Sequence, residues 1–81
     1  MERFGGPMEQ RSPLSPDIWL HSVFDCKAAQ QGGIIRRKSR DVERYTGLAR
    51  LVSESRRRGF RVVENGANIL VICNHDPIRF L

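Results

Sequence analysis

The stretch "SESRRRGFRVVENGANILVIC", residues 53–73, decides the predicted fold. Asn65-Gly66 stands between the segments "FRVVE" and "NILVIC", and an Asn-Gly pair flanked by β-branched residues is the strongest short-range signal of a β-hairpin. Both residues accept the positive φ angles of a type I′ turn. Upstream, Gly59 follows three arginines, as expected where a helix ends. The stretch therefore predicts the end of a helix followed by a hairpin.

The second strand of this hairpin is predicted to lie at the centre of the sheet. "ILVIC", residues 69–73, is apolar on both faces, which is typical of a strand that helices cover. In the first strand we expect Phe60 and Val62 to face the core and Arg61 to face solvent, because side chains alternate along a strand. "IRFL", residues 78–81, is a candidate for one final edge strand.

The ordered part of the chain is predicted to begin at Ser15, after a flexible N-terminal arm of residues 1–14. Ser15-Pro16-Asp17 has the features of a helix start: a hydroxyl N-cap, a proline in the first turn, and an acid near the positive end of the helix dipole. We expect this helix to run to about Gln30 and to end at Gly32-Gly33. Residues 15–81 are thus predicted to form a single α+β domain.

A short strand is predicted next, over "GIIRRK", residues 33–38. Its adjacent isoleucines are β-branched, which favours extended backbone. Ser39 or Asp41 is then expected to cap the following helix.

Two helices are predicted between this strand and the hairpin. Thr46 can cap the second of them, which runs from Leu48 to Arg58. One long helix over residues 40–58 is the alternative, but Gly47 would destabilise it by about 1 kcal/mol relative to alanine. We therefore expect two helices.

The helix of residues 48–58 has one predicted buried face and one predicted exposed face. Apolar or small residues recur at helical spacing on the buried face: Leu48, Leu51, Val52 and Ser55. The opposite face carries Arg50, Ser53, Glu54 and Arg57, with Arg56 and Arg58 on its flanks. Glu54 is expected to lie in the middle of this exposed face.

Basic charge is concentrated in one part of the chain. The formal net charge of the protein is +5. The window from Arg36 to Arg61 contains ten basic and three acidic residues, so its own formal charge is +7. Such a concentration indicates an anionic partner, which is most often nucleic acid.

The order of helix, short strand, two helices and a β-hairpin resembles a winged helix-turn-helix domain. This resemblance implies that the third helix enters the major groove and that the hairpin acts as a wing. Arg50 and Arg57 would contact guanine edges or phosphate, and Ser53 would donate to phosphate. The other candidate nucleic-acid-binding residues would position the backbone or widen the footprint: Arg56, Arg58, Arg61, Arg36, Arg37 and Lys38. The predicted function is regulatory DNA binding without catalysis.

Two other binding functions are kept as alternatives. The same basic helix face could serve a protein–protein interaction module or accessory subunit that binds an acidic protein surface. The passage "RRRGFRVVENGANI" also resembles the helix and hairpin of double-stranded-RNA-binding-like toxin ribonucleases, which implies RNA contact. Those toxins have a histidine after Gly-Ser, where this chain has Gly66-Ala67-Asn68.

A longer pattern, "PDIWLHSVF…GGIIRR…DVERYTG…RRRGFRVVENG…ICN", resembles a family of short bacterial proteins without established function. Genome annotation sometimes labels them N-(5′-phosphoribosyl)anthranilate isomerase. That isomerase is an eight-stranded barrel, which needs about 200 or more residues. The chain has 81 residues, so we expect no isomerase activity and no enzyme.

The remaining features predict no cofactor and no membrane insertion. His21, Cys26, Cys73 and His75 do not have the spacing of a zinc site, so no metal is expected. The longest apolar run has five residues, which is far short of a membrane span. We therefore expect a cytoplasmic protein, and a homodimer is compatible with its small core.

Overall fold

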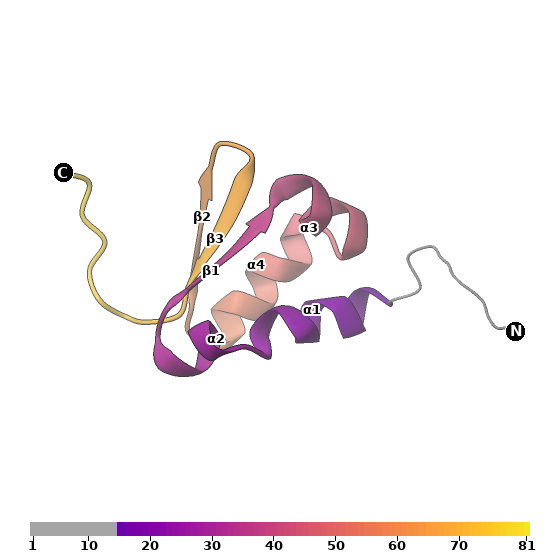
Figure 1. The fold of residues 1–81 in the computed structure, drawn as a ribbon, viewed down its shortest axis with the longest axis horizontal. Helices are drawn as coiled ribbons and strands as arrows, with labels where there is room; N and C mark the ends of the chain where they lie inside the picture. Colours follow the sequence, from indigo (N-terminus) through magenta and orange to yellow (C-terminus); the bar gives the residue numbers. More distant parts are fainter. Residues whose placement is uncertain (1–14) are drawn as a thin grey trace, which may run out of the picture.

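The computed structural model describes residues 15–81, which form four helices and a three-stranded antiparallel sheet. The predicted arm of residues 1–14 lies outside the described residues. The elements follow the order α1 (Pro16–Phe24), α2 (Lys27–Gln31), β1 (Ile34–Lys38), α3 (Ser39–Tyr45), α4 (Leu48–Arg57), β2 (Arg61–Asn65) and β3 (Asn68–Ile72). Helices cover one side of the sheet (Figure 1). The predicted α+β class is confirmed.

The first helix begins as predicted but ends earlier. The Ser15 side chain accepts a hydrogen bond from the backbone N–H of Ile18 at 3.1 Å, as an N-cap does. The prediction of one helix to Gln30 is wrong, because Asp25 leaves helical geometry (φ −92°, ψ 68°) and Cys26 is extended. The two residues turn the chain, so that α1 and α2 are separate helices. Gly32 ends α2 in the left-handed conformation, which confirms the predicted stop.

The prediction of two helices before the hairpin is confirmed, but the predicted caps are wrong. Gly47 separates α3 from α4 with φ +90°, a conformation that other residues rarely adopt. The Thr46 hydroxyl donates to the Pro16 carbonyl instead of capping α4, and Glu43 accepts from the Leu48 N–H at 3.3 Å. The N-cap of α4 is therefore Gly47, and a side chain from the preceding helix accepts one of its first N–H groups.

At the start of α3, neither Ser39 nor Asp41 is the N-cap. Lys38 occupies that position and makes no side-chain capping bond. Ser39 is the first helical residue, and its backbone N–H donates to the Ala67 carbonyl in the hairpin turn at 2.8 Å. The turn therefore replaces a capping side chain.

The sheet has the order β1-β3-β2, which confirms the apolar strand β3 as its centre. The predicted hairpin is present, but its two-residue turn is Gly66-Ala67 rather than Asn65-Gly66. Asn65 pairs with Asn68 as the last residue of β2, and Gly66 has φ +60°. The turn is displaced by one residue because the glycine takes its first central position.

The predicted last edge strand is absent from the described residues. Residues 73–81 form no strand, and the chain leaves the body of the domain after Cys73, which is still buried (Figure 1). Asn74 donates to the Gly32 carbonyl at 2.7 Å, and its own side-chain oxygen accepts from the Asp76 N–H at 3.0 Å. These bonds turn the chain away from the sheet edge before Pro77, which has no N–H for a ladder.

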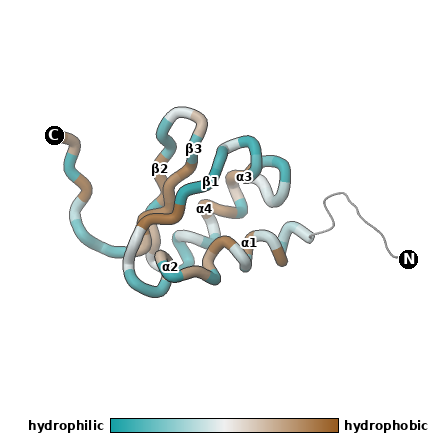
Figure 2. The backbone as a smooth tube through the Cα atoms, in the orientation of Figure 1, coloured by the Kyte–Doolittle hydropathy of each residue, from teal (hydrophilic) through white to brown (hydrophobic). Residues whose placement is uncertain are grey.

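The core lies between the helices and the covered face of the sheet. Its buried members are Leu20, Val23, Phe24, Ile35, Val42, Leu51, Ile69, Val71 and Cys73. Phe60 and Val62 pack against it as predicted. Figure 2 shows the hydrophobic colour along β3. The other face of the sheet is not covered by helices, and Ile34 on it is 56% exposed. One face of the sheet is therefore occupied by the helices, whereas the other is open to solvent or to a partner.

Candidate nucleic-acid interface

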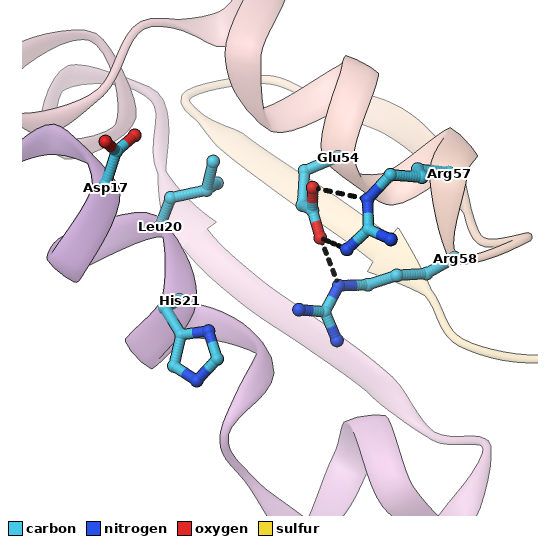
Figure 3. Close-up of a pocket in the computed structure, with 6 residues that line it drawn as sticks. All are labelled: Asp17, Leu20, His21, Glu54, Arg57 and Arg58. Atoms are coloured by element: carbon cyan, nitrogen blue, oxygen red, sulfur yellow. Dashed lines mark hydrogen bonds and ion pairs between the residues drawn. The ribbon is translucent and has the colours of Figure 1, made fainter.

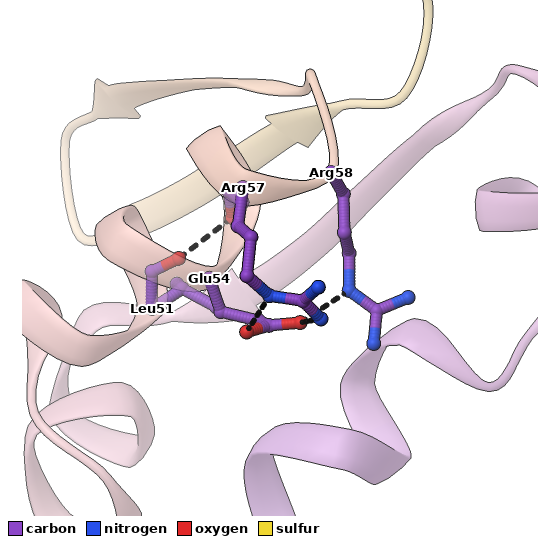
Figure 4. A network of polar contacts seen from close by, with 5 residues as sticks. Leu51, Glu54, Arg57 and Arg58 are labelled. Carbon is purple, nitrogen blue, oxygen red and sulfur yellow. Dashed lines mark hydrogen bonds and ion pairs between the residues drawn. The ribbon is translucent and has the colours of Figure 1, made fainter.

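Helix α4 turns one face to the core and one to solvent. Leu51 and Ser55 are fully buried on the inner face, as predicted. The prediction that Leu48 and Val52 are also buried there is wrong, because both are half-buried and border an open hollow. The Ser55 hydroxyl donates to the Leu51 carbonyl at 2.7 Å, so this buried polar group is satisfied within the helix (Figure 4). Four of the predicted site residues are exposed on the outward face: Arg50, Ser53, Arg56 and Arg57. The structure thus brings these four together, and we call them the α4 face.

The end of α4 fixes where the chain enters the hairpin. Gly59 has φ +81°, its N–H donates to the Arg56 carbonyl at 2.9 Å, and the Phe60 N–H donates to the Ser55 carbonyl at 2.8 Å. These two bonds form the Schellman motif that commonly ends a helix at a glycine. Phe60 consequently enters the core beside Phe24, with ring centroids 6.1 Å apart.

Glu54 is bonded to two consecutive arginines. Its carboxylate accepts from Arg57 Nε at 3.0 Å and Nη2 at 2.5 Å, and from Arg58 Nε at 2.7 Å (Figure 4). The hydrogen bonds from Arg57 and then Arg58 lower the pKa of Glu54 to about 2. The prediction that Glu54 lies in the middle of the exposed face is wrong. Its side chain is 20% exposed and borders the pocket that α4 shares with α1 (Figure 3).

Arg58 belongs to the contact between α1 and α4 rather than to the α4 face. Its guanidinium carbon lies 4.4 Å from the centroid of the Phe24 ring, and its side chain is 29% exposed. A cation over an aromatic face is attracted by the ring quadrupole. With Glu54 on one side and Phe24 on the other, Arg58 is held in place.

A second ion pair joins α4 to α1. Arg50 pairs with Asp17, which lies in the first turn of α1. Between the two helices is a pocket of about 290 Å³, lined by Asp17, Leu20, His21, Glu54, Arg57 and Arg58 (Figure 3). It contains two carboxylates and two guanidinium groups, so their formal charges cancel. This pocket is therefore not a concentrated basic site.

Arg56 differs from its neighbours on α4. It is exposed, and no carboxylate of residues 15–81 forms an ion pair with it. It borders an open hollow of about 530 Å³ that is lined by Leu48, Ala49, Val52, Ser53 and Arg56. Among the described residues, Arg56 is thus the arginine of α4 whose charge is not offset by a bonded acid.

Arg61 is used within the domain. Its Nη2 donates to the carbonyls of Asn74 at 2.8 Å and Asp76 at 2.6 Å. By register it lies beside Ile72, on the sheet face away from the helices. The prediction that Arg61 faces solvent is right only in that the side chain points away from the core, because the residue is half-buried and its guanidinium holds the C-terminal segment.

The basic residues of β1 lie apart from the α4 face. Arg36 and Lys38 are exposed and share the uncovered face of the sheet, while Arg37 alternates to the other face and donates to the Arg36 carbonyl. An open hollow of about 540 Å³ there is lined by Arg36, Lys38, Ser39, Arg40, Ala67 and Asn68. Helix α4 packs on the opposite face of the sheet. One flat partner therefore does not contact both the α4 face and the basic residues Arg36 and Lys38.

Sequence reasoning missed the contribution of α1 to this site. Asp17, Leu20 and His21 line the pocket from α1. The ring of Phe24 lies against the guanidinium of Arg58. The Arg50–Asp17 pair joins positions 33 apart, and no local pattern indicates it. The bonds from Glu54 could have been found, because acid and base at i, i+3 and i, i+4 are neighbours on a helix.

The described residues also limit other kinds of site. Residues 15–81 contain no group of three His, Cys, Asp or Glu side chains that could hold a metal ion. Burial raises the pKa of the Cys73 thiol, which makes it less reactive. No helix in the described part of the chain is both long enough and apolar enough to cross a membrane. Comparisons with protein-family models, curated proteins and solved structures find no match to this chain.

Proposed function

We propose that this domain binds nucleic acid through the α4 face, as a winged-helix-like module with a binding rather than a catalytic role. The observation that carries the proposal is Arg56, which is exposed on the same face as Arg50 and Arg57 and has no acid bonded to it among residues 15–81. Exposed arginines on one helix face can approach phosphates or base edges together.

The arrangement of elements supports the same proposal. The sheet order β1-β3-β2, with α3 and α4 between β1 and the hairpin, is similar to the arrangement of winged-helix domains, and α2 is an additional short helix. The hairpin tip, residues 64–68, has the sequence "ENGAN" and contains no basic residue. A wing of this composition would contribute amide groups, so α4 would supply most of the attraction to phosphate.

A partner protein with an acidic surface is the second candidate for the α4 face. The hollow beside Arg56 is lined on its other side by Leu48, Ala49 and Val52, and such an apolar surface suits an anchoring side chain of a protein. Nucleic acid would use the arginines alone, whereas a protein would use both the arginine and the hollow.

The salt dependence of binding to duplex DNA tests the proposal. A protein that contacts Z phosphates loses affinity with a log–log slope of about −0.9Z, so phosphate contacts by Arg56 and Arg50 predict a slope of about −2. Arg56→Ala should make the slope shallower by about 1. Arg36→Ala, on the opposite side of the domain, is the matched control and should leave it unchanged. No duplex binding at about 50 mM salt would contradict the proposal. Duplex RNA in a parallel titration shows which nucleic acid is preferred.

A further inference from the structure

The bonds between Glu54 and Arg57 leave one edge of an exposed guanidinium available. Arg57 donates to Glu54 through Nε and Nη2, which is the side edge of the guanidinium fork. Within residues 15–81, Nη1 of Arg57 makes no hydrogen bond, and the side chain is 70% exposed. The end edge, formed by Nη1 and the second hydrogen of Nη2, therefore keeps two parallel donors.

Glu54 is itself held by the core of the domain. It accepts a third hydrogen bond, from Arg58, and Arg58 lies over the ring of Phe24, which is 4% exposed. Phe24, Arg58 and Glu54 thus link an exposed guanidinium to a buried ring. An arginine with a fixed orientation loses less side-chain freedom when it binds, so its contacts contribute more to affinity.

The carboxylate reduces the formal charge of this cluster from +2 to +1, so the cluster attracts phosphate less strongly than two free arginines would. The Glu54 carboxylate offsets one of the two arginines that it bonds and would repel a phosphate at the same place. A neutral acceptor pair is not repelled in this way. In the major groove, guanine presents N7 and O6 side by side, and they match the two parallel donors of an arginine end edge.

We propose that Arg57 reads a guanine in duplex DNA and that Glu54 is the positioning residue that presents its end edge. This inference rests on the proposed nucleic-acid binding by the α4 face. It assigns different roles to adjacent arginines: Arg56 attracts phosphate, Arg57 recognises a base, and Arg58 supports Glu54.

Selection from a library of duplexes with a randomised core tests the inference. The wild-type protein should enrich a guanine at one position. Replacing that guanine with 7-deazaguanine, which lacks N7, should weaken binding about 5- to 150-fold, whereas inosine, which keeps N7 and O6, should have little effect. Arg57→Lys keeps the charge but not the planar fork, so the salt slope should persist while the preference for guanine decreases several-fold.

Glu54→Gln separates positioning from simple charge competition. Loss of a negative charge should leave binding to guanine-free duplex equal or tighter. If Glu54 positions Arg57, the same variant should reduce the preference for guanine over adenine several-fold. An equal gain in affinity for both duplexes would show that Glu54 only competes with phosphate, and it would overturn the inference.

Two further outcomes distinguish this inference from the function on which it rests. Salt-dependent, Arg56-dependent binding without any enriched guanine would overturn the role of Arg57 and leave the proposed function standing. No binding by the wild-type protein or by either variant would overturn both. Circular dichroism and thermal melting of each variant confirm that it is folded. If Glu54→Gln does not fold, Arg57→Lys still tests the role of Arg57, because the Arg57 side chain is 70% exposed.

Discussion

The guanidinium carbon of Arg58 lies 4.4 Å from the centroid of the Phe24 ring. This contact joins the last turn of α4 to the end of α1, and it sets Arg58 apart from Arg56, which is exposed two positions earlier. The three consecutive arginines therefore have different environments, although their sequence is uniform.

Removal of Arg58 should reduce stability more than removal of Arg56. Arg58→Ala eliminates a contact over an aromatic ring that is worth about 0.5–2 kcal/mol, together with a hydrogen bond to Glu54. Arg56→Ala, an exposed substitution on the same helix, should change the free energy of unfolding by less than about 0.5 kcal/mol. Urea denaturation of the two variants measures the difference. Equal effects would mean that the Arg58–Phe24 contact contributes nothing to stability.

Stability should decrease in acid partly through Glu54. Hydrogen bonds from Arg57 and Arg58 lower the pKa of Glu54 from the ordinary value of 4.5 to about 2 in the folded protein. A carboxyl group whose pKa is lower in the folded state stabilises the fold fully when the pH is above its pKa in the unfolded chain. For Glu54 this contribution is lost as the pH falls from about 4.5 to about 2. Because water partly screens the cluster, the contribution is about 1 kcal/mol or less.

Glu54→Gln is the matched variant for this pH effect. The difference in unfolding free energy between the wild type and the variant should be largest above pH 4.5 and shrink as the pH falls toward 2. Urea denaturation at a series of pH values in this range measures it. A difference that stays constant with pH would contradict the assigned pKa.

Alanine at Gly59 should be more damaging than alanine at Gly66. Both glycines have positive φ, which costs another residue about 1–2 kcal/mol. At Gly59 an added Cβ would also lie 2.9 Å from Nε2 of the exposed His75 side chain, which must rotate away at a small additional cost, whereas at Gly66 it would meet no atom within 4 Å. Thermal melting of the two variants and of the Gly59→Ala/His75→Ala double variant separates the effects. The double variant should regain only the stability lost through the contact with His75 and not the part lost through the positive φ. Equal melting temperatures for the two single variants would contradict this account.

Leu51 should be the most important apolar residue of α4 for stability. It is fully buried, so Leu51→Ala should reduce the free energy of unfolding by about 2–5 kcal/mol. Leu48 is half-buried on the same helix, so Leu48→Ala should reduce the free energy of unfolding by less. Denaturant midpoints of the two variants provide the measurement, and the reverse order of effects would contradict the inner face described for α4.

Local signals predicted much of the fold. Turn residues and hydrophobic periodicity, which act between neighbours in the sequence, predicted four features. These are the hairpin, the central strand, the inner face of α4, and the helix ends at Gly32, Gly47 and Gly59. The misplaced turn differs by a single residue, because Gly66 supplies the positive φ in either register.

The arrangement of the site was less predictable because it depends on contacts between distant segments. Nothing local indicates that Arg50 would pair with Asp17, or that Arg61 would hold the carbonyls of Asn74 and Asp76. The break at Asp25 was not predicted either, because Leu20, Phe24 and Ala28 keep helical spacing across it. Sequence reasoning consequently grouped ten basic residues that the fold distributes over both sides of the sheet.

Matched charge reversals on the two sides of the domain test the central claim most directly. The affinity of each variant for the same duplex is measured by fluorescence anisotropy at about 50 mM salt. Arg56→Glu, on the α4 face, should weaken binding by about tenfold or more, and Arg36→Glu, on the uncovered sheet face, should leave it nearly unchanged. Equal loss in both variants, or no binding by the wild-type protein, would contradict the claim that the α4 face binds nucleic acid.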